Sequence, residues 1–143
     1  MLDTNILVRI CLPTGNRDVQ EWFQSLLLRG ADAPEILVSV LADYELRKTL
    51  IRRGASTSLG QLDSLAGSMT YVSVTAEAVR RAADLAARLS PEDRRQISDV
   101  DVLIAAQAEL AGALLVTSDH RLRAMPEITA KDWSEIEIGE DGS

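Results

Sequence analysis

The chain has 143 residues, of which 46% are hydrophobic and 26% charged; this fits one globular domain and excludes a mostly disordered chain. A single cysteine, Cys11, excludes an internal disulfide and a cysteine-rich zinc site. The formal net charge of −7 and the 3% of aromatic residues disfavour a basic or base-stacking nucleic-acid-binding module. No long apolar run or signal peptide is recognisable, so we expect a cytoplasmic protein.

Short apolar runs alternate with longer amphipathic segments along the chain. The first half is predicted to contain a short strand ending at Asp3, helices over 5–12 and 17–28, a strand over 36–38, helices over 40–53 and 56–68, and a strand over 71–74. The second half is predicted to contain a helix after Thr75, a polar connection over 90–96, a helix over 98–111, and strands over 114–117 and 128–130.

Strands separated by helices indicate a parallel sheet covered on both faces, a three-layer α/β/α sandwich. We expect residues 1–138 to form this single domain and residues 139–143 to be a disordered polar tail.

Two aspartates follow predicted strands. Asp3 ends the first strand, and Asp119 comes two residues after the strand over 114–117. If these strands are parallel, both side chains emerge at the same edge of the sheet, where open α/β sheets bind their ligands. The alternative interpretation is that each is an ordinary turn or helix-capping aspartate.

Two further acids lie on predicted helices. Asp101 falls in the first turn of a helix that is apolar on nearly all sides, although Ser98 and Asp101 also fit a capping box. Glu45 borders the apolar arc that we predict for its helix, formed by Val40, Leu41, Tyr44 and Ile51. The alternative for Glu45 is a boundary residue that pairs with a neighbouring polar side chain.

Four carboxylates near one edge cannot all stay ionised without compensation, because repulsion and desolvation raise their pKa values. Oxygen ligands without a cysteine or histidine set favour Mg²⁺ or Mn²⁺ over zinc. One or two such ions could hold a phosphodiester and activate water for hydrolysis.

Four segments occur in order along the chain: Leu2–Leu7 (LDTNIL), the isolated Glu45, residues 101–108 (DVLIAAQA) and residues 115–119 (LVTSD). Together they resemble the PIN-domain ribonucleases, in particular the VapC-type toxins of toxin–antitoxin pairs. The resemblance implies a Mg²⁺- or Mn²⁺-dependent endoribonuclease with one or two metals per site, held by Asp3, Glu45, Asp101 and Asp119. It also implies supporting hydrogen bonds from Asn5 and Thr117, a homodimer, and a small antitoxin protein as partner.

An acidic nuclease still needs phosphate contacts, for which Arg47, Arg52 and Arg121 are candidates because they follow acids of the predicted site. Ordinary surface charge is the alternative for each. At the level of function, the alternative is a catalytically silent PIN-like domain that binds a protein or RNA. A receiver-type phosphotransfer domain fits less well, because Thr4 and Asn5 follow Asp3 where a second acid is expected, and Lys131 lies well beyond the predicted last strand but one.

Overall fold

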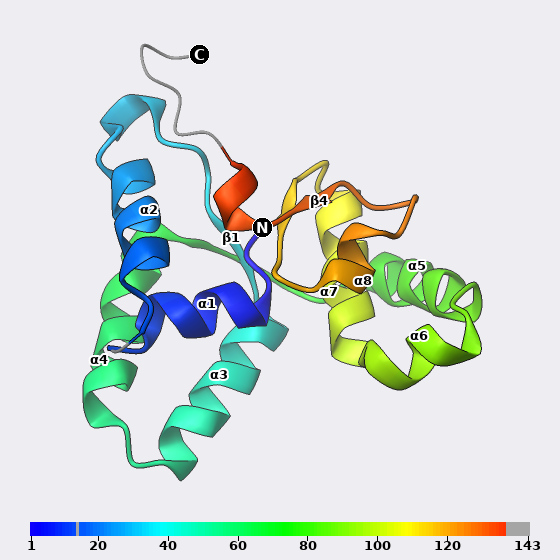
Figure 1. Ribbon diagram of the computed structural model, residues 1–143, viewed down its shortest axis with the longest axis horizontal. Coiled ribbons are helices and arrows are strands. Elements are labelled where there is room, and N and C mark those ends of the chain that lie inside the picture. The colour runs from blue at the N-terminus through cyan, green and yellow to red at the C-terminus, as the bar shows by residue number, and fades with distance from the viewer. Residues whose placement is uncertain (14, 137–143) are drawn as a thin grey trace.

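The structure, a computed structural model, describes residues 1–13 and 15–136 (Figure 1). This part of the chain forms the helices α1 (Thr4–Cys11), α2 (Arg17–Leu27), α3 (Val40–Arg52), α4 (Ser56–Leu65), α5 (Ala76–Ala87), α6 (Pro91–Gln96), α7 (Asp99–Leu110) and α8 (His120–Arg123). Single 3₁₀ turns cover Gly30–Asp32, Ala66–Ser68 and Trp133–Glu135. The predicted tail over 139–143 lies outside the described residues.

The strands are short and parallel. They are β1 (Leu37–Ser39), β2 (Thr70–Val72), β3 (Leu115–Val116) and β4 (Ala130–Lys131), with β1 paired to β2 and β3 paired to β4. Leu2 joins the two pairs, because it forms parallel bridges to both Val38 and Val116. The order across the sheet is therefore β2, β1, Leu2, β3, β4, with the N-terminal segment at its centre.

The helices form two groups on either side of this centre. In Figure 1, α1 to α4 lie on one side of the N-terminal segment and α5 to α8 on the other. The central strand residues are buried, with Leu2 at 2% exposure and Val38 and Leu115 at 0%. The predicted α/β fold with a short, covered parallel sheet is confirmed. No helix in the described residues has the length and apolarity needed to cross a membrane.

Polar side chains set the helix starts that the sequence predicted. Ser39 accepts a hydrogen bond of 3.1 Å from the Leu41 N–H at the start of α3, and Thr75 accepts one of 3.1 Å from the Ala78 N–H at the start of α5. Each hydroxyl satisfies a backbone donor that has no partner within its own helix.

The prediction of a polar connection over 90–96 was wrong, because this segment forms α6. Ser90 caps the helix through a 3.1 Å bond from the Asp93 N–H, and Pro91 occupies the first turn, where its missing N–H costs nothing. Acidic residues in the first turn and Arg94 and Arg95 in the last complement the helix dipole. These local interactions stabilise a helix that has no apolar stripe. Helices were predicted from apolar stripes, so this one was missed.

Candidate active site

Asp3 lies at the carboxyl end of the central strand and is 1% exposed. Its Oδ1 atom accepts a 2.8 Å hydrogen bond from the Thr4 N–H and thereby caps α1. Its Oδ2 atom accepts bonds from the Thr117 hydroxyl at 2.7 Å and from Asn5 Nδ2 at 3.3 Å. Both carboxylate oxygens of a buried acid are thus held by donors from two chain segments.

Asn5 and Thr117 also hold the end of β3 against the start of α1. Asn5 Nδ2 lies 3.2 Å from the Thr117 hydroxyl, and Asn5 Oδ1 accepts a 3.2 Å bond from the Ser118 N–H. The Thr117 hydroxyl in turn accepts a 3.1 Å bond from the Asp119 N–H. The two residues therefore link Asp3 to the loop that carries Asp119.

Asp119 caps α8. Its Oδ1 atom accepts a hydrogen bond of 2.8 Å from the Arg121 N–H, and its own backbone is extended, as is usual at a helix start. Asp119 is half-buried, so its second carboxylate oxygen is available to another ligand.

Asp101 forms a capping box at the start of α7. Its N–H donates to the Ser98 hydroxyl at 3.1 Å, and its Oδ2 atom accepts from the Ser98 N–H at 3.1 Å. The capping interpretation of Asp101 is therefore correct, and it is compatible with a place in the site. The helix behind it is buried on most sides, as its sequence predicted.

Glu45 projects from α3 toward the start of α1, where its Oε1 atom accepts a 2.8 Å bond from the Thr4 hydroxyl. Thr4 is thus the residue that connects Glu45 to the segment bearing Asp3. Thr4 had no predicted role, although it lies between Asp3 and Asn5. A hydroxyl next to a candidate acid was the signal that could have identified it.

The apolar arc predicted for α3 was wrong. The buried face consists of Ala42, Leu46 and Leu50, whereas Tyr44 is 60% and Ile51 61% exposed. Both sides of this helix carry apolar residues at helical spacing, so the hydrophobic pattern alone did not distinguish them. Glu45 lies beside this buried face because it follows Ala42 by three positions, and it is half-buried.

The electrostatics of Asp3 show that three of the acids are close enough to interact. Burial raises the pKa of Asp3 from 3.8 to about 6; the hydrogen bonds from Thr117 and Thr4 oppose this shift, and the charges of Asp101 and Asp119 add to it. A buried carboxylate with two acidic neighbours is the situation that a cation relieves most effectively.

A metal ion is compatible with these donors by their chemistry, since all of them are oxygens and Asp3 is a destabilised anion. Within residues 1–13 and 15–136, however, no three acidic, cysteine or histidine side chains already form a set that could hold a metal. The hydrogen bonds given above engage one carboxylate oxygen each of Glu45, Asp101 and Asp119. The second oxygen of each carboxylate is left to coordinate a metal ion.

The candidate phosphate contacts differ in availability. The Arg47 guanidinium pairs with Asp43 at 3.1 Å and with Asp63 at 2.9 Å, and these bonds raise its pKa above the ordinary value. Arg52 is exposed at the far end of α3. Arg121 lies two residues after Asp119, and its Nε atom is 4.0 Å from Asp93 Oδ1.

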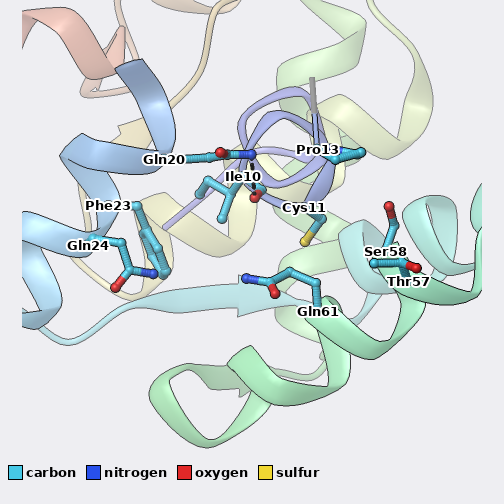
Figure 2. A pocket seen from close by; sticks show the side chains of 9 residues that line it. All are labelled: Ile10, Cys11, Pro13, Gln20, Phe23, Gln24, Thr57, Ser58 and Gln61. Carbon is cyan, nitrogen blue, oxygen red and sulfur yellow. Dashed lines mark hydrogen bonds between the residues drawn. The ribbon is translucent and has the colours of Figure 1, made fainter. Parts of the chain in front are cut away.

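A second concave region lies away from these acids, between α1, α2 and α4 (Figure 2). It encloses about 290 Å³ and is lined by glutamine amides, by Phe23 and by the Cys11 thiol. Gln20 reaches from α2 to the last carbonyls of α1, including that of Leu12 at 2.5 Å, so its amide closes the end of that helix. Cys11 is 3% exposed and part of the apolar core, as predicted.

The chain belongs to the PIN domain family, because the model of that family matches residues 1–128. Proteins of this family are generally nucleases, and such nucleases generally use divalent metal ions. The resemblance inferred from the four sequence segments is thereby confirmed at the level of the family.

Two solved structures show the same fold. The structure of VapBC2 from Rickettsia felis, bound to a DNA fragment from its promoter, superposes with a TM-score of 0.75 at 23% identity, covering 93% of this chain and 97% of that chain. FitAcB from Neisseria gonorrhoeae gives a TM-score of 0.69 at 18% identity, covering 94% of this chain and 98% of that chain. The comparison with curated protein sequences gives no match.

Proposed function

We propose that this PIN domain is a Mg²⁺- or Mn²⁺-dependent endoribonuclease and the toxin of a toxin–antitoxin pair. The observation that carries the proposal is the buried Asp3, whose pKa is raised to about 6 by burial and by the charges of Asp101 and Asp119. Asp3 caps α1, but a cap does not require a buried carboxylate beside two further acids, whereas a cation or a reaction would use that arrangement.

In this proposal Asp3, Glu45, Asp101 and Asp119 hold one or two metal ions. The metal supplies an activated water and neutralises charge on the scissile phosphate. Thr117 and Asn5 fix the orientation of the Asp3 carboxylate through the bonds at 2.7 and 3.3 Å. Of the three candidate arginines we retain Arg52 and Arg121 as phosphate contacts, because Arg47 already binds two carboxylates.

The proposed partners are a small antitoxin protein and a second copy of the chain. The similarity of fold to VapBC2 supports the first. The exposed Tyr44 and Ile51 on α3 support an additional protein contact, because large apolar side chains in water favour association. Light scattering of the purified chain measures whether it is a dimer.

The nuclease proposal is tested on purified protein with single-stranded RNA and DNA, with Mn²⁺ or with chelator. We expect metal-dependent RNA cleavage that is lost in D3N and D101N. D99N is the matched control, because Asp99 is an exposed acid in the same first turn of α7 as Asp101. Circular dichroism establishes that each variant is folded.

Metal binding is measured separately by calorimetry, so that the readout does not depend on cleavage. We expect Mn²⁺ to bind the wild type and D99N but not D3N. Wild-type protein that binds no Mn²⁺ and cleaves no RNA would instead support the alternative, a catalytically silent binding domain.

A further inference from the structure

A cavity of about 360 Å³ lies between α6, α8 and the residues that join α5 to α6. None of the four proposed metal-binding acids lines it. Its rim carries three basic side chains, those of Arg88, His120 and Arg121.

The cavity adjoins the candidate active site through α8. The Arg121 N–H donates to Asp119 Oδ1 at 2.8 Å, so α8 connects the cavity directly to that acid. The other wall is the N-terminal part of α6, at Glu92 and Asp93, and the chain leads from there through Ile97 to Ser98, whose N–H donates to Asp101 at 3.1 Å. A phosphodiester bound at Asp101 and Asp119 therefore places its neighbouring nucleotide beside the cavity.

The inner surface is suited to a flat nucleobase. Leu89 and Met125 line it and are each only 8% exposed, which gives an apolar floor. The guanidinium groups of Arg88 and Arg121 and the imidazole of His120 are planar groups of the kind on which unstacked RNA bases lie. Both arginines form ion pairs, Arg121 with Asp93 at 4.0 Å and Arg88 with Asp84 at 3.0 Å and Glu127 at 4.0 Å. Pairs made through the guanidinium nitrogens leave the flat face of each group to a base.

Two carboxylates complete the lining, those of Glu92 and Asp93. An ionised carboxylate only accepts hydrogen bonds. Guanine, adenine and cytosine each present an amino group on the pairing edge, whereas uracil presents one N–H between two carbonyl oxygens. The carboxylates therefore favour the amino-bearing bases and disfavour uracil, whose oxygens they repel.

We propose that this cavity binds the base of the RNA nucleotide next to the scissile phosphodiester and selects bases that carry an amino group. The inference rests on the proposed nuclease function and adds to it the position and the chemical basis of substrate selection.

The test uses a pool of single-stranded RNA with randomised sequence, cleaved by the full chain in Mn²⁺, with the product ends sequenced. For wild-type protein we expect uracil to be depleted about tenfold at one position beside the cut, the discrimination typical of a carboxylate–base contact. In the double variant E92Q/D93N the amides offer donors as well as acceptors, so we expect uracil to be cleaved as readily as the other bases.

The matched control is D18N/E77Q, which neutralises one first-turn acid in each of α2 and α5, away from the cavity. It is expected to keep the wild-type preference, and thermal unfolding followed by circular dichroism checks that both double variants are folded. Wild-type cleavage without a base preference beside the cut overturns the inference and leaves the nuclease proposal standing. The same holds if the preference is unchanged in E92Q/D93N. Absence of any metal-dependent RNA cleavage by the wild type overturns the nuclease proposal itself.

Discussion

The Thr4 hydroxyl donates a 2.8 Å hydrogen bond to Glu45 Oε1, across a separation of 41 positions in the sequence. Thr4 is the first residue of α1, and its N–H is bound by the Asp3 carboxylate. One residue thus connects the acid of α3 to the acid of the central strand. In the proposed site, this hydrogen bond would orient the Glu45 carboxylate.

Replacing Thr4 by valine is expected to remove the bond to Glu45 while keeping a branched side chain. The lost bond costs about 1 kcal/mol in the free energy of unfolding, measured by urea denaturation. We also expect weaker Mn²⁺ binding, measured by calorimetry, because Glu45 is no longer oriented. T4S keeps the hydroxyl and serves as the control; weakened metal binding in T4S to the same extent would contradict this role.

Stability in chelator should depend on pH through Asp3. The pKa of this group is raised in the folded state to about 6 from 3.8, so the folded protein binds the proton more tightly than the unfolded chain. The penalty is small below pH 4, grows between pH 4 and pH 6, and levels off at about 3 kcal/mol above pH 6. D3N removes it.

Thermal unfolding of wild type and D3N at pH 5 and pH 8, both in chelator, measures this effect. D3N is expected to gain melting temperature over the wild type at pH 8 and to lose about half of that advantage at pH 5. Adding Mn²⁺ at pH 8 should raise the melting temperature of the wild type alone. The same difference in melting temperature between the two proteins at both pH values would show that burial does not destabilise the ionised form of Asp3.

Cys11 is expected to be unreactive in the folded protein. Burial, with a smaller contribution from the charge of Asp43, raises the pKa of its thiol to about 11, and the side chain is 3% exposed. At pH 8 only about one thiol in a thousand is then ionised, and the thiolate is the reacting species. Alkylation followed by mass spectrometry should show labelling only after denaturant is added; fast labelling of native protein would refute the burial of Cys11.

Gln107 holds the end of β2 to α7. Its Nε2 atom donates to the carbonyls of Val72 and Ser73 at 3.2 and 3.1 Å, and the residue is 3% exposed. Q107L leaves both carbonyls without this donor and is expected to cost about 1–3 kcal/mol in urea denaturation. Q96L, on exposed α6, should change stability by less than about 0.5 kcal/mol. Equal changes in the free energy of unfolding for the two substitutions would show that the hydrogen bonds of Gln107 do not stabilise the fold.

Much of the framework was predictable because its signals are local. Ser39 and Thr75 precede helices as capping residues, and the apolar runs around Val38 and Leu115 form strands in the positions expected. The positions of Asp3 and Asp119 after strands follow from the same local pattern. The family resemblance likewise depends on short segments in a fixed order, and the match over residues 1–128 confirms it.

Only the tertiary structure decided which side of α3 is buried and how the acids are connected. Ala42, Leu46 and Leu50 face the core because the neighbouring helices cover that side, while the equally apolar Tyr44 and Ile51 remain in water. The bond from Thr4 to Glu45 and the burial that raises the pKa of Asp3 likewise need segments that are distant in the sequence. Hydrophobic periodicity reports the repeat of a helix and the identity of its side chains, but the packing partner determines which side loses contact with water.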